Sequence, residues 1–276
     1  MYVLIALGLT LVYGVMRIPN FAHGEYYLFG AYTTYFSISI LNLPAPLAIL
    51  AAAVVGLVFG ALIEKVTFGP LRKRNKGDWV MNTFLVAAGI QLIIQNSALY
   101  FLGAEFRGVQ ALWQGNIKIG VYNITVDRAV AFGIAMMAVL VFWIFLKRTR
   151  TGNAILSVAE HETGAMLMGV QIDKIHTLTY ALSCMLAALA GGALISITPA
   201  YPTMGLQPLY AAWFVVILVG LGNLQAVLAG GFIVGLVEVA ATYWLGAAWQ
   251  NAVSLSVIVL VLIFKPSGLF GRKAKV

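Results

Sequence analysis

Nine consecutive residues, Arg17-Ile18-Pro19-Asn20-Phe21-Ala22-His23-Gly24-Glu25, bring a cation, an anion, an imidazole and an amide together between two apolar runs. Polar groups in such a setting lie at a bilayer boundary, line a wet cavity or interrupt a helix. We therefore predict that Asn20, His23, Gly24 and Glu25 belong to a substrate pathway or its gate. For Glu25 a plainer interpretation stays open: an acid in the first turn of a helix, or an ion-pair partner of Arg17.

Three further polar side chains stand inside apolar runs, namely Gln95, Asn96 and Glu238. A charge at the bilayer centre costs at least ~3 kcal/mol on insertion scales, so such a group is usually paired or functional. Amides and carboxyls in this setting either line a pathway or join two helices by a hydrogen bond. We expect helix joining for these three side chains, with a pathway role as the alternative.

Motifs for catalysis and cofactor binding are missing from the sequence. It contains no Gly-x-x-x-x-Gly-Lys-Ser/Thr phosphate loop, no His-Glu-x-x-His and no Gly-x-Ser-x-Gly. The three histidines, His23, His161 and His176, stand in separate segments, and Cys184 is the single cysteine. We therefore expect no enzymatic activity, no metal and no disulfide within this chain.

The composition indicates a membrane protein. Of the 276 residues 62% are hydrophobic and 9% are charged, whereas a soluble domain has about 25% charged residues. Long apolar runs without alternation favour helices, so we predict an all-α fold, a single polytopic transmembrane bundle over residues 1–276 with about eight or nine segments. The candidate segments are 2–16, 24–41, 45–64, 79–102, 128–147, 176–198, 209–222, 224–245 and 249–264.

The net charge of +8 is distributed unevenly over the loops. All lysines and arginines except Arg107, Lys118 and Arg128 fall in loops that share one side, which the positive-inside rule makes cytoplasmic. This places the C-terminus in the cytoplasm and the Arg17–Glu25 stretch at the cytoplasmic side of a helix break. Because the basic residues lie in short loops and not on one folded face, we expect no nucleic-acid partner.

Two loops are long enough to have structure of their own. The outer loop, about 103–127, partly alternates over 116–126 and predicts a small hairpin that either docks an external partner or forms a cap. The inner connection, about 147–175, predicts a helix over 154–169 that follows Gly152 and ends at Gly169. The apolar face of that helix needs either the membrane surface or the groove of a soluble partner.

Three separated stretches, Ala6–Glu25, Thr151–Gly169 and Phe264–Arg272, resemble the membrane subunits of branched-chain amino acid ABC importers, of the H-type subunit. Urea and amide importers share this family. The sequence departs from the family pattern in a short first segment, in Pro19, and in Leu156, where the family often has an arginine.

The resemblance implies a permease subunit that translocates branched-chain or other hydrophobic amino acids across the bacterial inner (plasma) membrane. Its partners would be a second permease subunit, sister or identical, two cytoplasmic ATPase subunits that use ATP, and a periplasmic or lipid-anchored substrate-binding protein. The inner helix would be the cytoplasmic coupling helix, with ATPase contacts expected at Ala159, Glu160, Glu162, Ala165 and Gly169.

Other functions stay open at this stage. The cargo could be urea or a short amide, because the family includes such importers. The chain could also be an ion-coupled secondary carrier that uses Glu25 or Glu238 as the ion site, or a membrane scaffold without transport activity. Dependence of uptake on partner ATPases separates the ABC importer from the other two classes.

Overall fold

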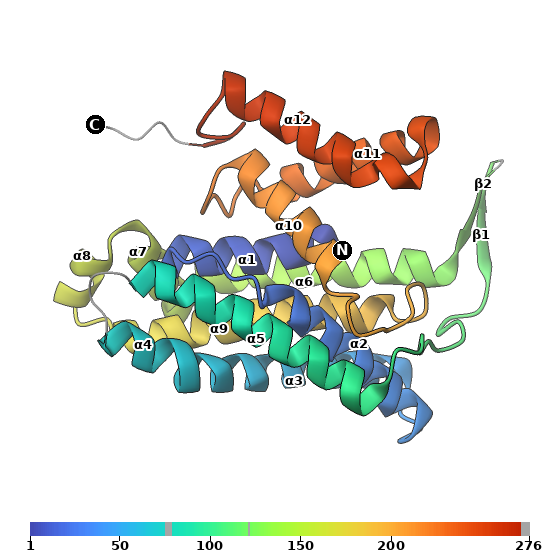
Figure 1. The fold of residues 1–276 in the computed structure, drawn as a ribbon, viewed down its shortest axis with the longest axis horizontal. Helices are drawn as coiled ribbons and strands as arrows, with labels where there is room; N and C mark the ends of the chain where they lie inside the picture. Colours follow the sequence, from blue (N-terminus) through green and yellow to red (C-terminus); the bar gives the residue numbers. More distant parts are fainter. Residues whose placement is uncertain (75–78, 121, 272–276) are drawn as a thin grey trace.

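Helices dominate the structure, because an apolar chain segment in lipid can satisfy its backbone groups only within a helix or a closed barrel. The computed structural model describes residues 1–74, 79–120 and 122–271 (Figure 1). The helices that follow the predicted segments are α1 (Tyr2–Met16), α2 (His23–Ser39), α3 (Ala45–Ile63), α5 (Trp79–Leu102), α6 (Val126–Arg148), α9 (Ile172–Leu194), α10 (Leu206–Val219), α11 (Val227–Leu245) and α12 (Gln250–Phe264). Each of the nine predicted segments therefore coincides with one helix in the described part of the chain, which confirms the all-α bundle.

Shorter elements connect these helices. A five-residue π-helical turn (η1, Glu64–Phe68) and α4 (Gly69–Arg74) continue α3, and a 3₁₀ turn (η2, Ala247–Trp249) precedes α12. Two short helices, α7 (Arg150–Glu160) and α8 (Glu162–Leu167), lie between α6 and α9. In the described residues, six helical stretches are long and apolar enough to cross a membrane, and α1 and α10 are shorter apolar helices.

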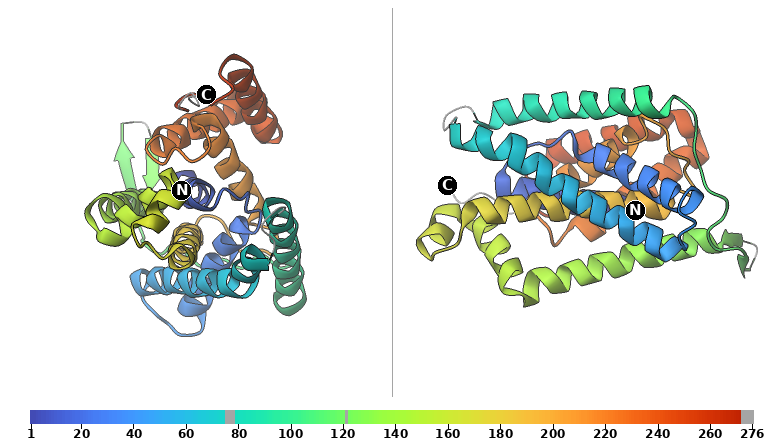
Figure 2. Two further views of the ribbon diagram at one scale, coloured as in Figure 1. Left: turned by 90° about the vertical axis from the view of Figure 1, so that its left-hand side faces the viewer. Right: turned by 90° about the horizontal axis from the view of Figure 1, so that it is seen from below.

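Helix α9 occupies the centre of the bundle. It packs against α1, α2, α3 and α7. In its most apolar stretch of 18 residues 67% are buried, compared with 11% in the corresponding stretch of α5 and 22% in that of α6. With 23 residues α9 is about 34 Å long, enough to cross a hydrocarbon core of ~30 Å. Figure 2 shows α5, α6 and the α11–α12 pair at the periphery of the bundle. These helices expose apolar side chains, as a lipid-facing surface requires.

Small residues allow the helices to pack closely around α9. A methyl group added at Gly30 of α2 would collide with the Ala188 carbonyl, and one at Gly191 of α9 would collide with the Tyr27 carbonyl. On α3, Gly56 and Gly60 lie against Ala188 and Cys184 of α9. Close backbone approach at small residues is the usual way in which membrane helices associate.

The bundle has two distinct ends (Figure 1). One end carries α4, α7 and α8, and we call it the α8 end; the opposite end carries the hairpin of β1 (Asn116–Ile119) and β2 (Tyr122–Thr125), and we call it the hairpin end. The strands are antiparallel with Asn116 opposite Thr125 and Lys118 opposite Asn123, which confirms the hairpin predicted over 116–126. Gly120 has a φ of 62° in the turn between them.

Candidate functional site

The chain reverses direction between α1 and α2 and returns into the bundle. Arg17 adopts a left-handed conformation (φ 55°) at the end of α1, and its side chain is exposed. Asn20 is fully buried; its Oδ1 accepts a hydrogen bond from the Ala22 backbone N–H at 3.1 Å, at the start of α2. Its Nδ2 donates to the Tyr180 hydroxyl at 3.0 Å, so a hydrogen bond links the segment between α1 and α2 to α9.

This geometry corrects the predicted position of the polar stretch. Tyr180 and Ser183, the partners of Asn20 and His23, lie near the middle of α9, so Asn20–Glu25 lie halfway along the bundle and not at the α8 end, which the charge distribution predicts to be cytoplasmic. Arg17 directly follows the last residue of α1, and α1 runs toward the α8 end before the chain returns (Figure 1). The prediction was wrong because charge counting locates a loop and cannot detect a loop that folds back between helices.

His23 joins three helices. Its Nε2 lies 3.1 Å from the Ile5 carbonyl of α1, and its Nδ1 lies 3.4 Å from the Ser183 hydroxyl of α9. A carbonyl can only accept a hydrogen bond, so Nε2 carries the hydrogen and Nδ1 accepts from Ser183. The ring is fully buried, and with both nitrogens occupied it acts as a joint between α1, α2 and α9.

Gly24 allows α2 to touch the segment before α10. A Cβ at Gly24 would collide with the Gly205 carbonyl, and a Cβ at Gly205 would collide with the Gly24 carbonyl. No larger residue fits at either position without separating the two backbones. Gly24 therefore has a packing role in this arrangement.

Glu25 pairs with Gln95 of α5. The Gln95 Nε2 donates to Glu25 Oε1 at 2.7 Å, so Gln95 joins α5 to α2 as the helix-joining prediction expects. Glu25 is buried, and its Oε2 has no hydrogen-bond partner among the residues that the structure describes. The ion pair with Arg17 that the sequence left open is not formed. Asn96 is exposed and donates to the Leu92 carbonyl of its own helix at 2.8 Å, so it joins no helices here.

A pocket lies on the hairpin-end side of this pair. It has a volume of about 230 Å³ and is lined by Gln95, Asn96, Leu99, Ala104, Phe106, Tyr201, Pro202 and Thr203. Near α10 and the other half of α5, Phe21 stacks on Trp213 with ring centroids 5.7 Å apart, and meets Phe84 edge-on at 5.2 Å. The pocket, the Glu25–Gln95 pair and the aromatic cluster of Phe21, Phe84 and Trp213 all lie between α2, α5 and the α10 region.

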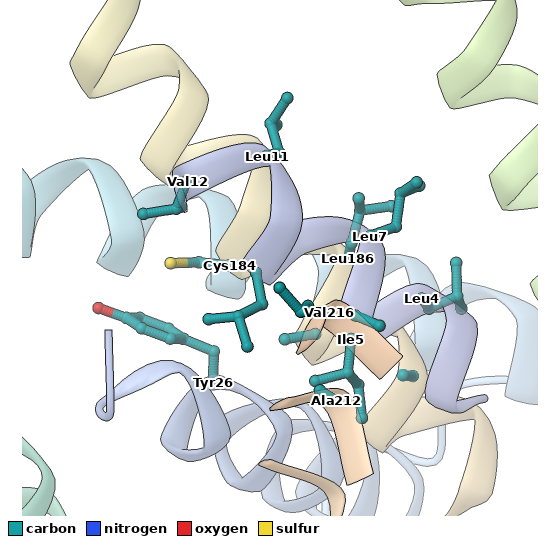
Figure 3. Close-up of a cluster of buried hydrophobic side chains, with 14 of the residues drawn as sticks. Leu4, Ile5, Leu7, Leu11, Val12, Tyr26, Cys184, Leu186, Ala212 and Val216 are labelled. Carbon is teal, nitrogen blue, oxygen red and sulfur yellow. The ribbon is translucent and has the colours of Figure 1, made fainter. Parts of the chain in front are cut away.

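Two buried tyrosines, Tyr26 and Tyr180, lie beside Asn20. We call Asn20, His23 and Tyr180 the polar centre. Tyr26 donates a hydrogen bond to the Tyr180 hydroxyl at 3.3 Å, and Tyr180 in turn accepts from Asn20. Figure 3 shows Tyr26 at the edge of the apolar cluster of α1, α9 and α10, with its hydroxyl directed away from Leu4 and Ile5 and the Cys184 sulfur on the hydroxyl side. Sequence reasoning missed both tyrosines, because an isolated tyrosine in an apolar run carries no local signal of a partner 154 residues away.

Glu238 joins α11 to α12. Its Oε2 accepts a hydrogen bond from Gln250 Nε2 at 2.7 Å, and only 3% of the residue is exposed. The pair lies away from the polar centre formed by Asn20, His23 and Tyr180. The geometry matches the helix-joining interpretation of this carboxyl.

The inner connection forms two helices, and the predicted single helix over 154–169 is wrong in this respect. His161 breaks it: its Nδ1 accepts a hydrogen bond from the Gly164 backbone N–H at 2.9 Å and caps α8. Gly152 lies inside α7 and does not precede it. Gly169 follows α8 with a φ of 83°, which confirms it as the terminator.

The predicted contact residues of this connection differ in exposure. Glu160, Glu162 and Gly169 are exposed, Ala159 is half-buried, and Ala165 is buried. The sequence did not single out Met166, Leu167 and Met168, whose exposed fractions are 56%, 80% and 86%. These three residues, which we call the apolar tip, lie at the α8 end of the molecule.

A cluster of charged residues joins η1 and α4, which continue α3, to the start of α9. Arg72 Nη1 lies 3.1 Å from Glu64 Oε1 and its Nη2 lies 2.8 Å from Asp173 Oδ1. Glu64 is 1% exposed and also accepts a hydrogen bond from Thr177 of α9. This cluster, which the sequence analysis missed, anchors the first turn of α9 directly after the α7–α8 connection.

A helical, multi-pass membrane protein with a polar break at its centre is the class that this fold and site define. A family model described as branched-chain amino acid transport system / permease component matches residues 1–263, and the chain belongs to this family. The membrane-spanning architecture and the transport role of a permease follow from that membership.

Curated relatives cover nearly the whole chain. The high-affinity branched-chain amino acid transport system permease protein LivH of Escherichia coli K12 is 29% identical over 98% of this chain and 91% of its own length. Its counterpart BraD of Pseudomonas aeruginosa is 28% identical over 98% and 92%, and a probable LivH of Methanocaldococcus jannaschii is 27% identical over 98% and 88%. No solved structure matches the chain significantly.

Proposed function

We propose that this chain is a permease subunit of an ATP-driven importer in a bacterial inner membrane and that its cargo is a branched-chain or other hydrophobic amino acid. Support comes from the family match and from relatives whose names state this transport system. ATP would be used by two partner ATPase subunits, and this chain would hold no cofactor. Among the described residues, no group of three or more histidine, cysteine or acidic side chains comes together.

The apolar tip is the observation that carries this proposal. Met166 and Leu167 end the six-residue helix α8, Met168 follows it, and all three side chains are exposed. Apolar side chains at the end of a loop cost free energy in water, and a short helix presenting them fits the groove of a soluble partner. A cytoplasmic ATPase is the partner that an importer of this kind requires.

The inner connection between α6 and α9 would transmit a displacement of α8 to α9. Ala165 anchors α8 by burial, and Arg72 holds Asp173 at the start of α9. A push on α8 would therefore act on α9, and Asn20 and His23 are bonded to the middle of α9. Reorientation of the polar centre would follow from movement of the tip.

The substrate path would lie between α2, α5 and α10. Cargo delivered by a binding protein at the hairpin end would enter the pocket beside Gln95 and Asn96 and pass Glu25. The aromatic cluster of Phe21, Phe84 and Trp213 would then be the gate. A second permease subunit, sister or identical, would cover the lightly packed α5.

A substitution in the apolar tip tests the proposal. The chain would be co-expressed with its partner subunits, reconstituted with the binding protein and assayed for ATP-dependent leucine uptake. Leu167→Glu should weaken ATPase association about 30-fold, the effect of an interface hot spot of ~2 kcal/mol, and should abolish uptake. Gln171→Glu adds the same charge at an exposed position of the same loop and should preserve both.

Several outcomes would contradict the proposal. Normal ATPase association and uptake in Leu167→Glu would remove the docking role of the tip. Uptake that continues without ATP but responds to an ion gradient would favour the ion-coupled carrier. If urea or short amides compete with leucine uptake and bind the binding protein more tightly than leucine does, that result would assign the cargo to the amide class.

A further inference from the structure

An apolar groove runs along the α8-end half of α6. Its volume is about 310 Å³, and its walls come from α6, α1, α7 and the start of α11. The lining includes one leucine from each of these helices, namely Leu140 of α6, Leu7 of α1, Leu156 of α7 and Leu228 of α11. The groove lies outside the polar centre and plays no part in the path proposed above.

Among the described residues, the groove contains one cation, Lys147. Lys147 and Gln225 are the polar members of its lining, and the Lys147 ammonium lies 4.5 Å from the centre of the Trp143 ring. No carboxylate lies within 4 Å of that ammonium in the part of the chain that the structure describes. Arg148 and Arg150 follow directly and are exposed. A tryptophan beside a lysine at the end of an apolar helix marks the bilayer interface.

We propose that this groove binds an anionic phospholipid, with one acyl chain along α6 and the phosphate at Lys147. The apolar walls match the acyl chain, and the Lys147 ammonium in the lining matches the negative charge of the phosphate. Basic pockets between membrane helices at the cytoplasmic side are known to bind anionic headgroups in this way. The bound lipid would contact α6, α11 and Leu156 of α7 together.

The charge in the lining argues against a protein helix as the occupant of the groove. A helix of the second permease subunit would have to cover the Lys147 ammonium, which has no acidic partner in the described part of this chain, and would need an acidic residue of its own at that point.

Lipid retention measured by native mass spectrometry tests the proposal. The purified transporter would be titrated with phosphatidylglycerol or phosphatidylcholine of identical acyl chains. Wild-type protein should retain phosphatidylglycerol preferentially, and Lys147→Gln should lower that retention about fivefold, as expected for one cation at a membrane surface. Leu140→Trp, which fills the groove, should lower retention of both lipids.

Matched controls lie on α12 and just after it. Lys265→Gln removes an exposed cation from the residue that follows α12, and Leu260→Trp enlarges an exposed apolar residue of the same helix. Both should leave retention unchanged. Equal loss in Lys147→Gln and Lys265→Gln, or full retention of both lipids in Leu140→Trp, would overturn the site. Cross-linking of Leu140→Cys to the second permease subunit would assign the groove to a protein interface instead.

Discussion

The side chain of Asn20 makes two hydrogen bonds that point to different parts of the molecule. Its oxygen accepts from the backbone at the start of α2, and its nitrogen donates to Tyr180 in the middle of α9. His23 is similarly occupied on both sides by Ile5 and Ser183. In this stretch, Glu25 differs because one of its carboxylate oxygens is left without a partner among the described residues.

We expect Glu25→Gln to lower uptake without lowering the unfolding temperature. The substituted amide still offers an oxygen to Gln95 but removes a charge that is buried and half-satisfied, so the unfolding temperature should stay the same or rise. Uptake should fall roughly 10- to 100-fold, since a hydrogen bond to a charged group contributes roughly 1.5–3 kcal/mol. Uptake and thermal unfolding would be measured on the same reconstituted preparation.

Glu105→Gln is the control for this experiment, because Glu105 is exposed in the outer loop. Normal uptake by Glu25→Gln would show that the carboxylate has no role in the path. A lower unfolding temperature would assign Glu25 to packing instead.

At the residue level, the sequence reveals which side chains are polar but not which of them meet. The cluster of polar types in 17–25 was recognisable because its neighbours are apolar. The partners of these residues lie 70 residues away at Gln95 and 160 residues away at Tyr180 and Ser183. Only the packing of the helices brings them together, so the joint formed by His23 could not be distinguished from a pathway residue.

At the level of elements, close helix contacts depend on particular glycines. Gly191 of α9 faces the Tyr27 carbonyl of α2, whereas Gly235 of α11 has open space on the side where a Cβ would stand. The sequence contains Gly-x-x-x-Gly both at Gly56/Gly60 and at Gly231/Gly235. Gly56 and Gly60 of the first pair, and Gly231 of the second, lie at close contacts.

We expect Gly191→Ala to destabilise the bundle by about 1–3 kcal/mol, because the added methyl group forces α2 and α9 apart. Gly235→Ala makes the same chemical change in a helix without a collision, and it should be neutral or slightly stabilising. Thermal unfolding of the two purified variants would measure the difference. Equal unfolding temperatures would mean that α2 and α9 can separate freely.

The ion pair between Glu64 and Arg72 lies where η1 and α4 continue α3, and its carboxylate is buried. Arg72→Gln leaves Glu64 buried without its cation, and this should cost about 3–5 kcal/mol. The double variant Glu64→Gln with Arg72→Gln should recover most of that loss, since no charge is left unpaired. Lys73→Gln is the control, because Lys73 is 70% exposed and its partner Asp173 is exposed too. A loss in the double variant as large as in Arg72→Gln would contradict this explanation.

Elements were easier to predict than their breaks. Apolar runs of 14 to 24 residues predicted the nine main helices, since in lipid the backbone is satisfied only within a helix or a closed barrel. The break at His161 was missed because it depends on one side-chain hydrogen bond to Gly164 within an otherwise helical pattern. The π-helical turn at Glu64 was likewise invisible in the periodicity.

For the whole molecule, the distribution of charge predicts its orientation in the membrane. The α8 end carries most of the basic residues, and the hairpin end carries Lys118. The positive-inside rule then places α8 in the cytoplasm and the hairpin outside. The buried Cys184 is the single cysteine, so introduced cysteines can be labelled selectively.

Lys118→Cys should react with a membrane-impermeant maleimide in intact cells, whereas Thr163→Cys should react only after the membrane is opened. Both positions are exposed in the structure. Labelling would be followed by the mass shift of the purified chain, with the unmodified sequence as the control for Cys184. The reverse pattern would invert the proposed topology.

The π-helical turn Glu64–Phe68 has a consequence for how this sequence tolerates insertions and deletions. A π turn closes with the Gly69 N–H on the Glu64 carbonyl, and it holds one residue more than the α-helical path would. One residue corresponds to a rotation of about 100° around the helix axis. Deleting a single residue there would keep a continuous helix but would rotate Arg72 away from Asp173. The π turn therefore lets the packing of α3 against α9 and the direction in which α4 presents Arg72 change independently of each other.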